Sequence, residues 1–416
     1  MAPRLRREAS HRTSGYVRIV VQHAVISGAG IGGPALAHQL AARGWRTTVI
    51  ERYPERRDEG QNVDIRGAAR EVVRRMGIDA DVRAANTTEV GMRFVRDDGS
   101  TAAAFPVSPG TDGPTAELEI LRGELSRILI EHSDSTDFRF GTRIADVVDH
   151  GERVTVTLDD GDIIDADLLV IAEGLYSRTR RFVAATEVND LGMYIAYATI
   201  PRRDDDDNWW IWQHATESRS VHLRPDNLGT TRAMLSFISD VRGLDDLGRE
   251  DLNAILRRTF DDLGDVTPRI LDELDAGAPM YFSSVGQLSS PAWSKGRVAL
   301  LGDAAHCNAT FGGAGTSLAL IGAYILAGEL GSGDDVLGAL ARYERLMKPF
   351  IDAAPLIRPR MLRLMNPRTR SGIRALHASA GVVAGPVGRA LSSAASVAGK
   401  LPINLSAGDP QLPSYR

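Results

Sequence analysis

The chain has 416 residues, 43% of them hydrophobic and 25% charged, which is typical of a globular protein of two or three domains. Its net charge of −5 and isoelectric point of about 6.0 argue against a nucleic-acid-binding protein. With one cysteine and no apolar run of the roughly 18 residues that a membrane span needs, the sequence indicates a cytoplasmic protein without an internal disulfide.

The first residues are polar and arginine-rich and lack the apolar stretch of a secretory signal, so we expect a disordered extension over 1–16. Beyond it, the pattern predicts a buried strand at 24–27, a glycine-rich turn, a helix at 34–43 and a second strand that ends at Glu51. This order is typical of a βαβ unit.

The turn carries Gly28, Gly30 and Gly33 in the G-x-G-x-x-G spacing. Gly28 allows a tight turn off the strand, Gly30 lets a pyrophosphate approach the backbone at a helix N-terminus, and Gly33 lets the helix lie close to the sheet. Glu51 follows 18 residues after Gly33, where a carboxylate can accept hydrogen bonds from ribose hydroxyls. The segment predicts a site for the ADP half of a dinucleotide; the alternative is a tight turn in an ordinary βαβ unit.

Short strands and helices alternate up to residue 171. Helices are expected at 68–76 and 119–132, and a loop at 106–114. Strands are expected at 62–67, 91–96, 103–105, 138–140, 144–149, 153–158 and 163–171.

The character of the chain changes near residue 191, where strand-like runs separated by turn residues predict an antiparallel sheet and a second domain. Helices are expected after them at 249–260 and 267–275, then a buried parallel strand at 298–301 and a helix at 317–330. The acidic run 204–207 is expected to be a solvated loop. The four runs of the second sheet are 193–200, 209–214, 220–224 and 232–239.

One of these runs is unusually aromatic. The period of two places Trp210, Trp212 and His214 on one face of the strand. They either form an aromatic wall of a substrate pocket or belong to an ordinary packed core. Tyr197 and Phe311 are further candidates for the substrate pocket.

Three segments resemble, in order, the motifs of the FAD-dependent aromatic hydroxylases, the group A flavoprotein monooxygenases, and most closely their tetracycline-modifying and polyketide-tailoring branch. The first is GAGIGG at 28–33 with Glu51 and Arg52, the second is DLLVIAEGLYSR at 167–178, and the third joins GDAAH at 302–306 to GAGTS at 313–317. The resemblance covers about residues 25–346.

The resemblance implies noncovalent FAD, with NADPH or NADH as a transient reductant and O2 as the oxidant. Asp303 follows a buried strand, where it can accept from ribityl hydroxyls, and the third motif opens a helix whose N–H groups can face the flavin. The implied cofactor-binding residues are Gly28, Gly30, Gly33, Glu51, Arg52, Arg66, Arg122, Asp303, Gly313, Gly315 and Thr316.

Two departures from the family pattern bear on the reaction. The second motif has Glu173-Gly174 where the family usually has Asp-Gly, and 307–311 lacks the usual prolines beside the flavin. The first departure falls in a motif that the resemblance links to nicotinamide handling, and the second loosens a loop that shapes the oxygen-activation site.

We therefore expect an α/β fold, with a Rossmann-like FAD-binding domain, an inserted mostly antiparallel β substrate domain and C-terminal helices. The expected FAD-binding domain comprises 17–90, 115–185 and 286–345, the substrate domain 91–114 and 186–285, and the helical segment 346–416. The expected reaction hydroxylates or epoxidises an aromatic or polyketide-like molecule through a flavin hydroperoxide. The alternatives are a non-redox cyclase that uses FAD as a scaffold and an FAD-dependent oxidase or dehydrogenase.

Overall fold

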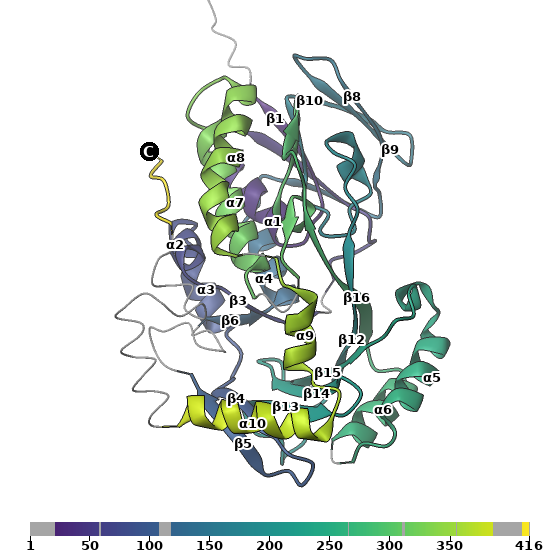
Figure 1. The fold of residues 1–416 in the computed structure, drawn as a ribbon. Coiled ribbons are helices and arrows are strands. Elements are labelled where there is room, and N and C mark those ends of the chain that lie inside the picture. Colours follow the sequence, from purple (N-terminus) through teal and green to yellow (C-terminus); the bar gives the residue numbers. More distant parts are fainter. Residues whose placement is uncertain are drawn as a thin grey trace, which may run out of the picture.

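The computed structural model describes residues 21–57, 60–107, 118–264, 266–309, 313–354, 356–385 and 410–415. Its upper part in Figure 1 is built on a six-stranded sheet of order β17-β18-β11-β1-β2-β7. The central strand β1 (His23–Ser27) pairs in parallel with β2 (Arg46–Glu51) on one side and β11 (Leu168–Ile171) on the other. The outer strands are β7 (Asp137–Phe140), β18 (Val298–Leu300) and the antiparallel β17 (Ser294–Lys295).

Helices from both ends of the chain pack on this sheet. α1 (Gly32–Ala41) lies against α7 (Gly315–Leu330), which is buried over nearly its whole length and packs in turn against α8 (Val336–Ala353). A helix that is apolar all round needs this complete cover. The remaining helices of this part are α2 (Ala68–Arg75), α3 (Asp79–Ala84) and α4 (Arg122–Glu131).

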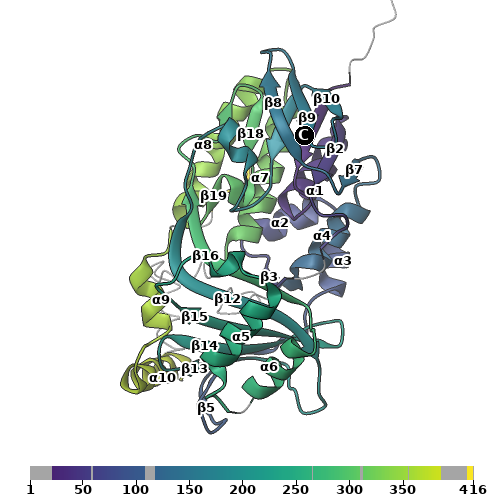
Figure 2. The ribbon, with the colours of Figure 1, turned by 90° about the vertical axis from the view of Figure 1, so that its right-hand side faces the viewer.

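The lower part is a strongly curved eight-stranded sheet of order β19-β16-β12-β15-β14-β13-β4-β5 (Figure 2). Its neighbours are antiparallel except for β13 and β4, which run parallel. Its strands are β4 (Gly91–Val95), β5 (Thr101–Pro106), β12 (Asn189–Pro201), β13 (Trp209–Ala215), β14 (Arg219–Pro225), β15 (Thr230–Ile238), β16 (Met280–Ser289) and β19 (His306–Cys307).

Different helices pack against the two faces of this sheet. One face packs Tyr194 and Leu235 against α5 (Arg249–Phe260) and α6 (Thr267–Asp275). The opposite face carries Tyr197 and meets α9 (Pro359–Met365) and α10 (Arg370–Ala384). Since strand side chains alternate between the faces, neighbouring residues serve different cores.

Two small sheets complete the fold. β8 (Ile144–Asp149), β9 (Val154–Leu158) and β10 (Ile163–Ala166) form an antiparallel sheet above the parallel one. β3 (Asn62–Asp64) pairs with β6 (Glu119–Leu121) between the two large sheets. In the described ranges, none of the helices combines the length and the apolar character needed to cross a bilayer.

The mixed α/β class is confirmed, and the helices expected at 249–260 and 267–275 have the predicted ends. The helix expected at 119–132 was wrong at its start, because Glu119–Leu121 is the strand β6 and the helix begins only at Arg122. The single strand expected at 163–171 is two strands in different sheets, divided at Asp167, whose carboxylate accepts from the backbone N–H of His23 at 2.8 Å.

The prediction for 204–207 was also wrong in one residue. Asp206 forms a two-fold hydrogen-bonded ion pair with the guanidinium of Arg269, at 2.6 and 2.7 Å, instead of pointing into solvent. Burial alone raises the pKa of Asp206, but the hydrogen bonds from Arg269, Arg203 and Thr231 lower it to about 2.

Candidate active site

The glycine turn between β1 and α1 has no room for side chains at two of its three positions. Gly28 has φ +109°, and a Cβ there would lie 2.5 Å from the carbonyl oxygen of Ala172. A Cβ at Gly33 would lie 1.9 Å from Gly28 O, so only glycine allows the helix to approach the strand this closely. At Gly30 a Cβ would meet Arg122 Nη2 at 3.2 Å, which places a cationic side chain directly above the turn.

Glu51 ends β2 beside this turn. Its Oε2 accepts from the N–H of Ala29 at 2.8 Å, and its Oε1 accepts from the N–H of Tyr53 at 3.1 Å. The carboxylate is therefore fixed against the turn, where ribose hydroxyls would lie in a dinucleotide complex. Arg52 next to it is exposed and lies over the Tyr53 ring, 4.8 Å from its centroid.

Asp303 lies in the turn after β18, facing the start of α7. A Cβ at Gly315 would lie 3.3 Å from Asp303 Oδ1, so the carboxylate and the helix N-terminus are in direct proximity. Burial raises the pKa of Asp303, and the Arg122 charge and a hydrogen bond with Cys307 oppose that shift. The same burial raises the pKa of the Cys307 thiol, which favours a neutral thiol over a reactive thiolate.

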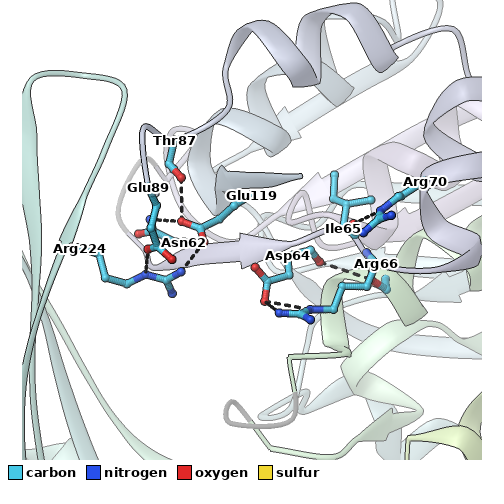
Figure 3. Close-up of polar contacts among 10 residues, drawn as sticks. Asn62, Asp64, Ile65, Arg66, Arg70, Thr87, Glu89, Glu119 and Arg224 are labelled. Carbon is cyan, nitrogen blue, oxygen red and sulfur yellow. Dashed lines mark hydrogen bonds and ion pairs between the residues drawn. The ribbon is translucent and has the colours of Figure 1, made fainter. Parts of the chain in front are cut away.

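The end of β3 meets the third motif from the other side. The Arg66 guanidinium pairs with Asp64 at 2.8 Å, as Figure 3 shows, and the Arg66 N–H donates to Ser317 Oγ at 3.0 Å. A Cβ at Gly313 would lie 3.7 Å from Asp64 Oδ2 and 4.0 Å from Arg66 Nε. Thr316 lies in the first turn of α7.

Glu173, which is one methylene longer than the aspartate usual in the resembling family, contacts the first motif from the second. Its Oε1 accepts from Ser27 Oγ at 2.5 Å and from Thr179 Oγ1 at 2.6 Å, and its Oε2 accepts from Ser177 Oγ at 2.7 Å. Ser27 immediately precedes the glycine turn. The Glu173 carboxylate therefore connects the 173–179 segment to the end of β1 by hydrogen bonds to both. Protein donors thus satisfy this acidic side chain.

The aromatic candidates on β13 share one face. The rings of Trp210 and Trp212 stack at 5.7 Å, and those of Trp212 and His214 at 5.1 Å. His214 and Trp212 also contact Phe94, and His214 Nδ1 lies 3.1 Å from His377 Nε2 on α10. Trp212 and His214 are therefore packed beneath α10. Trp210 packs against the same cluster, and the Arg224 guanidinium lies 4.1 Å from the centroid of its ring.

Between β3 and the large sheet lies a hollow that sequence reasoning missed. Of the residues that the sequence suggests for a substrate pocket, Tyr197 is the one found among the described residues that line this hollow. The lining residues are Gly60, Gln61, Asn62, Tyr197, Ala198, Thr199, Arg224, Arg232, Ala233, Met234 and Pro279. The strand period could have indicated Arg224 and Arg232, because two arginines in apolar strands share the face of Tyr197 and Met234.

Arg224 connects the hollow to a buried acidic pair (Figure 3). Its Nε donates to Glu89 Oε2 at 2.9 Å, its Nη2 donates to Glu119 Oε2, and its guanidinium lies 4.1 Å from the centroid of the Trp210 ring. Glu119 Oε1 also accepts from Asn62 Nδ2 at 2.6 Å. Burial raises the pKa of Glu89 well above its usual range, since one arginine cannot offset two buried carboxylates.

The structure thus brings together the three glycines of the turn, Glu51, Arg122, Asp303, Arg66 and the start of α7 around one region. Phe311 lies outside the described residues. The roles of the cofactor and substrate candidates remain predictions, as do the domain boundaries.

Comparisons with known proteins agree with this architecture. The sequence profile of a family described as FAD binding domain matches residues 22–353. The chain is 37% identical to the flavin-dependent monooxygenase eupH of a Phoma species, over 87% of this chain and 91% of that protein. It is 32% identical to the monooxygenase CTB7 of Cercospora beticola, over 79% of this chain and 83% of that one.

Solved structures of flavoproteins have a similar fold. The crystal structure of the tetracycline destructase Tet(51) superimposes with a TM-score of 0.75 at 28% identity, covering 95% of this chain and 100% of that one. HpxO of Klebsiella pneumoniae, crystallised with FAD and uric acid, superimposes with a TM-score of 0.72 at 21% identity, over 88% of this chain and 98% of that one. The second likeness concerns the fold alone.

Proposed function

The chain belongs to the FAD-binding domain family and is an FAD-dependent monooxygenase, and from that premise we propose that it hydroxylates or epoxidises an aromatic or polyketide-like small molecule in secondary metabolism. The observation that carries this proposal is the convergence of the three motif segments on one region. Relatives with the names flavin-dependent monooxygenase and tetracycline destructase support the substrate class.

The chain's own residues fit FAD. The glycine turn is a cradle that a Cβ would fill, with Arg122 above it for the pyrophosphate and Glu51 beside it for the adenosine ribose. Asp303, which faces the start of α7, would hold the ribityl chain, and the N–H groups of Gly315 and Thr316 would lie at the flavin ring. When bound, FAD supplies electron transfer from NAD(P)H and the activation of O2.

The two departures from the family pattern leave a second candidate, a scaffold cyclase that holds FAD without redox chemistry. The contacts of Glu173 hold the 173–179 segment in place and fit either candidate, whereas relatives named as flavin-dependent monooxygenases support the first. An oxidase or dehydrogenase is the third candidate.

Isotope labelling distinguishes the three candidates. FAD-loaded protein is mixed with NADPH, oxygen-18 gas and a panel of phenolic and quinone substrates. The molecular masses of the products are then measured by mass spectrometry. A monooxygenase puts one labelled atom into the product and consumes NADPH. An oxidase consumes O2 without labelling the product, and a cyclase changes its substrate with neither NADPH nor O2.

A further inference from the structure

The C-terminal helices concentrate positive charge. Between Asp352 and Asp409 the sequence has eight lysines and arginines and no aspartate or glutamate, in a chain whose net charge is −5. Over the described ranges, Arg368 pairs with Glu217 at 3.0 Å, and the other five arginines of this segment have no ion pair. The segment therefore has surplus positive charge for an anionic partner. Its described arginines, all exposed on α9, on α10 or beside them, are Arg358, Arg360, Arg363, Arg368, Arg370 and Arg374.

Large apolar side chains are exposed among these arginines. Leu364 is 62% exposed on α9, and Val382 is 68% exposed on α10. Single exposed apolar residues are ordinary on a protein surface, so their concentration in a short segment is the informative feature. Of the fourteen large apolar side chains that are exposed in the described ranges, five lie within 356–383: Leu356, Met361, Leu364, Val382 and Val383.

The two helices lie on the same side of the molecule. Both are in front in Figure 1, and both lie along the left margin in Figure 2. The inward side of each helix is used for packing, since Leu362 of α9 contacts the cluster of Tyr197 and Ala380 of α10 contacts the cluster of Phe94. The exposed arginines and aliphatic side chains therefore form an outer surface, which we call the α9–α10 surface.

The charges of this surface narrow the choice of partner. A second copy of the same surface would bring like charges together, which is unfavourable. The sequence from 386 to 408 adds Arg389 and Lys400 and no acid, so it cannot neutralise the arginines. The partner must therefore supply negative charge.

An anionic bilayer matches both features of the surface. Lipid phosphates attract arginine, and aliphatic side chains enter the boundary between the headgroups and the acyl chains. An acidic protein would satisfy the arginines, but Leu364 and Val382 stand on two separate helices, which suits a fluid layer better than a fixed socket. Peripheral binding of this kind needs no membrane-spanning helix.

We propose that the α9–α10 surface docks this protein on membranes that contain anionic phospholipids. The arginines bind lipid phosphates, and the exposed leucine, methionine and valine side chains insert at the interface. The contact is peripheral and reversible. It turns the Tyr197 face of the large sheet, against which both helices pack, toward the bilayer. The proposal concerns location and not the reaction, so it does not depend on which of the three candidate functions is correct.

Vesicle flotation of the FAD-loaded, full-length protein tests this without any turnover. Vesicles of phosphatidylcholine alone are compared with vesicles in which phosphatidylglycerol replaces about a third of the lipid. We expect binding to the anionic vesicles to be about tenfold tighter or more, and to weaken as salt is added. Equal binding to the two kinds of vesicle, or binding to neither, would overturn the proposal.

Two double variants assign the binding to this surface. Arg360→Gln combined with Arg374→Gln should weaken binding to the anionic vesicles by about tenfold or more. Leu364→Ser combined with Val382→Ser should also weaken it, by about fivefold or more, because the inserted apolar area is lost. All four side chains are exposed, and retained flavin absorbance shows that each variant is folded. Wild-type binding by both variants overturns the assignment to this surface.

Matched control variants change the same kinds of exposed side chain elsewhere. They should bind the anionic vesicles as the wild type does, and a loss as large as that of the test variants would overturn the assignment. The control for charge is Arg153→Gln with Arg258→Gln, and the control for apolar area is Ile163→Ser with Leu228→Ser.

Polyglutamate distinguishes a lipid surface from an acidic protein. It competes for the arginines but offers nothing to the aliphatic side chains. If polyglutamate removes all binding to the anionic vesicles, and the Leu364→Ser and Val382→Ser double variant binds them as tightly as the wild type, the surface recognises an acidic protein and the lipid proposal is overturned. Binding that resists polyglutamate in the wild type and is displaced in this variant supports the lipid proposal.

Discussion

Glu173 accepts a hydrogen bond from Ser27 Oγ at 2.5 Å, across the 146 residues that separate the second motif from the first. The contact joins the loop after β11 to the last residue of β1, just before the glycine turn. An aspartate, which is usual at this position in the resembling family, is one methylene shorter. The longer side chain lets one carboxylate contact Ser27, Ser177 and Thr179 together.

Shortening this side chain should therefore weaken FAD binding. Glu173→Asp loses at least one charge-assisted hydrogen bond, and we expect its FAD dissociation constant to rise by about tenfold. Flavin fluorescence titration measures the constant. Glu187→Asp is the control, because Glu187 is exposed. An unchanged FAD affinity in Glu173→Asp would show that the motif is not coupled to the turn.

Asp303 should lower the stability of the apoprotein while it strengthens the binding of FAD. Since burial raises the pKa of Asp303, its ionisation costs the apoprotein stability as the pH rises above the usual carboxyl range, and neutral pH lies above that range. Asp303→Asn should raise the melting temperature of the apoprotein at pH 7 and lower FAD affinity by about tenfold.

Scanning fluorimetry and FAD titration measure the two effects. Asp334→Asn, at an exposed position, should change neither. If Asp303→Asn binds FAD as the wild type does, Asp303 does not contact the ribityl chain.

Glu51 should serve FAD and not the nicotinamide. Its carboxylate is fixed at the only G-x-G-x-x-G turn that we identified in the sequence, which a flavin must occupy throughout turnover. Glu51→Ala should lower FAD occupancy, while the KM for NADPH of the flavin-loaded fraction changes little. Glu55→Ala, at an exposed position nearby, is the control. A variant that keeps FAD and loses only NADPH affinity would make this domain a nicotinamide-binding one.

The burial of His214 should make the stability of the fold depend on pH. Burial, followed by the charge of His377, lowers the pKa of His214 from 6.5 to about 3. The neutral ring is therefore favoured in the fold, so its stability contribution is complete above pH 6.5 and is lost as the pH falls from 6.5 toward 3. At pH 5 the loss from this group is about 2 kcal/mol.

Melting temperatures between pH 7.5 and pH 4.5 check this dependence. His214→Phe should flatten the curve, because the phenyl ring can keep the packing against Phe94 without titrating. His150→Phe, at an exposed position, should leave it as steep as in the wild type. Parallel curves for all three proteins would contradict the assignment.

The sequence predicted the first βαβ unit because its signals are local. The glycine spacing, the strand before it and the acid at Glu51 all lie within 30 residues and follow from backbone geometry. The strand Met280–Ser289 was not predicted, because three serines and a glycine obscure its pattern, although it pairs with β12 over most of its length.

The hollow could not be predicted for a different reason. Asn62, Glu119 and Arg224 come from three distant segments, and each looks like an ordinary polar residue in its own context. Their shared burial depends on how β3 and β6 dock against the large sheet. Only the tertiary structure shows that Asn62 Oδ1 has no donor among the residues that the structure describes.

The central claim is that this protein reduces and reoxidises its FAD, and the absorbance of the flavin tests it most directly. FAD-loaded protein is mixed with NADPH and the same panel of phenolic and quinone substrates under anaerobic conditions, and air is then admitted. We predict that the yellow flavin band bleaches without air and returns when O2 enters. A flavin that stays oxidised with excess NADPH and each of these substrates would contradict the monooxygenase account and favour a scaffold cyclase.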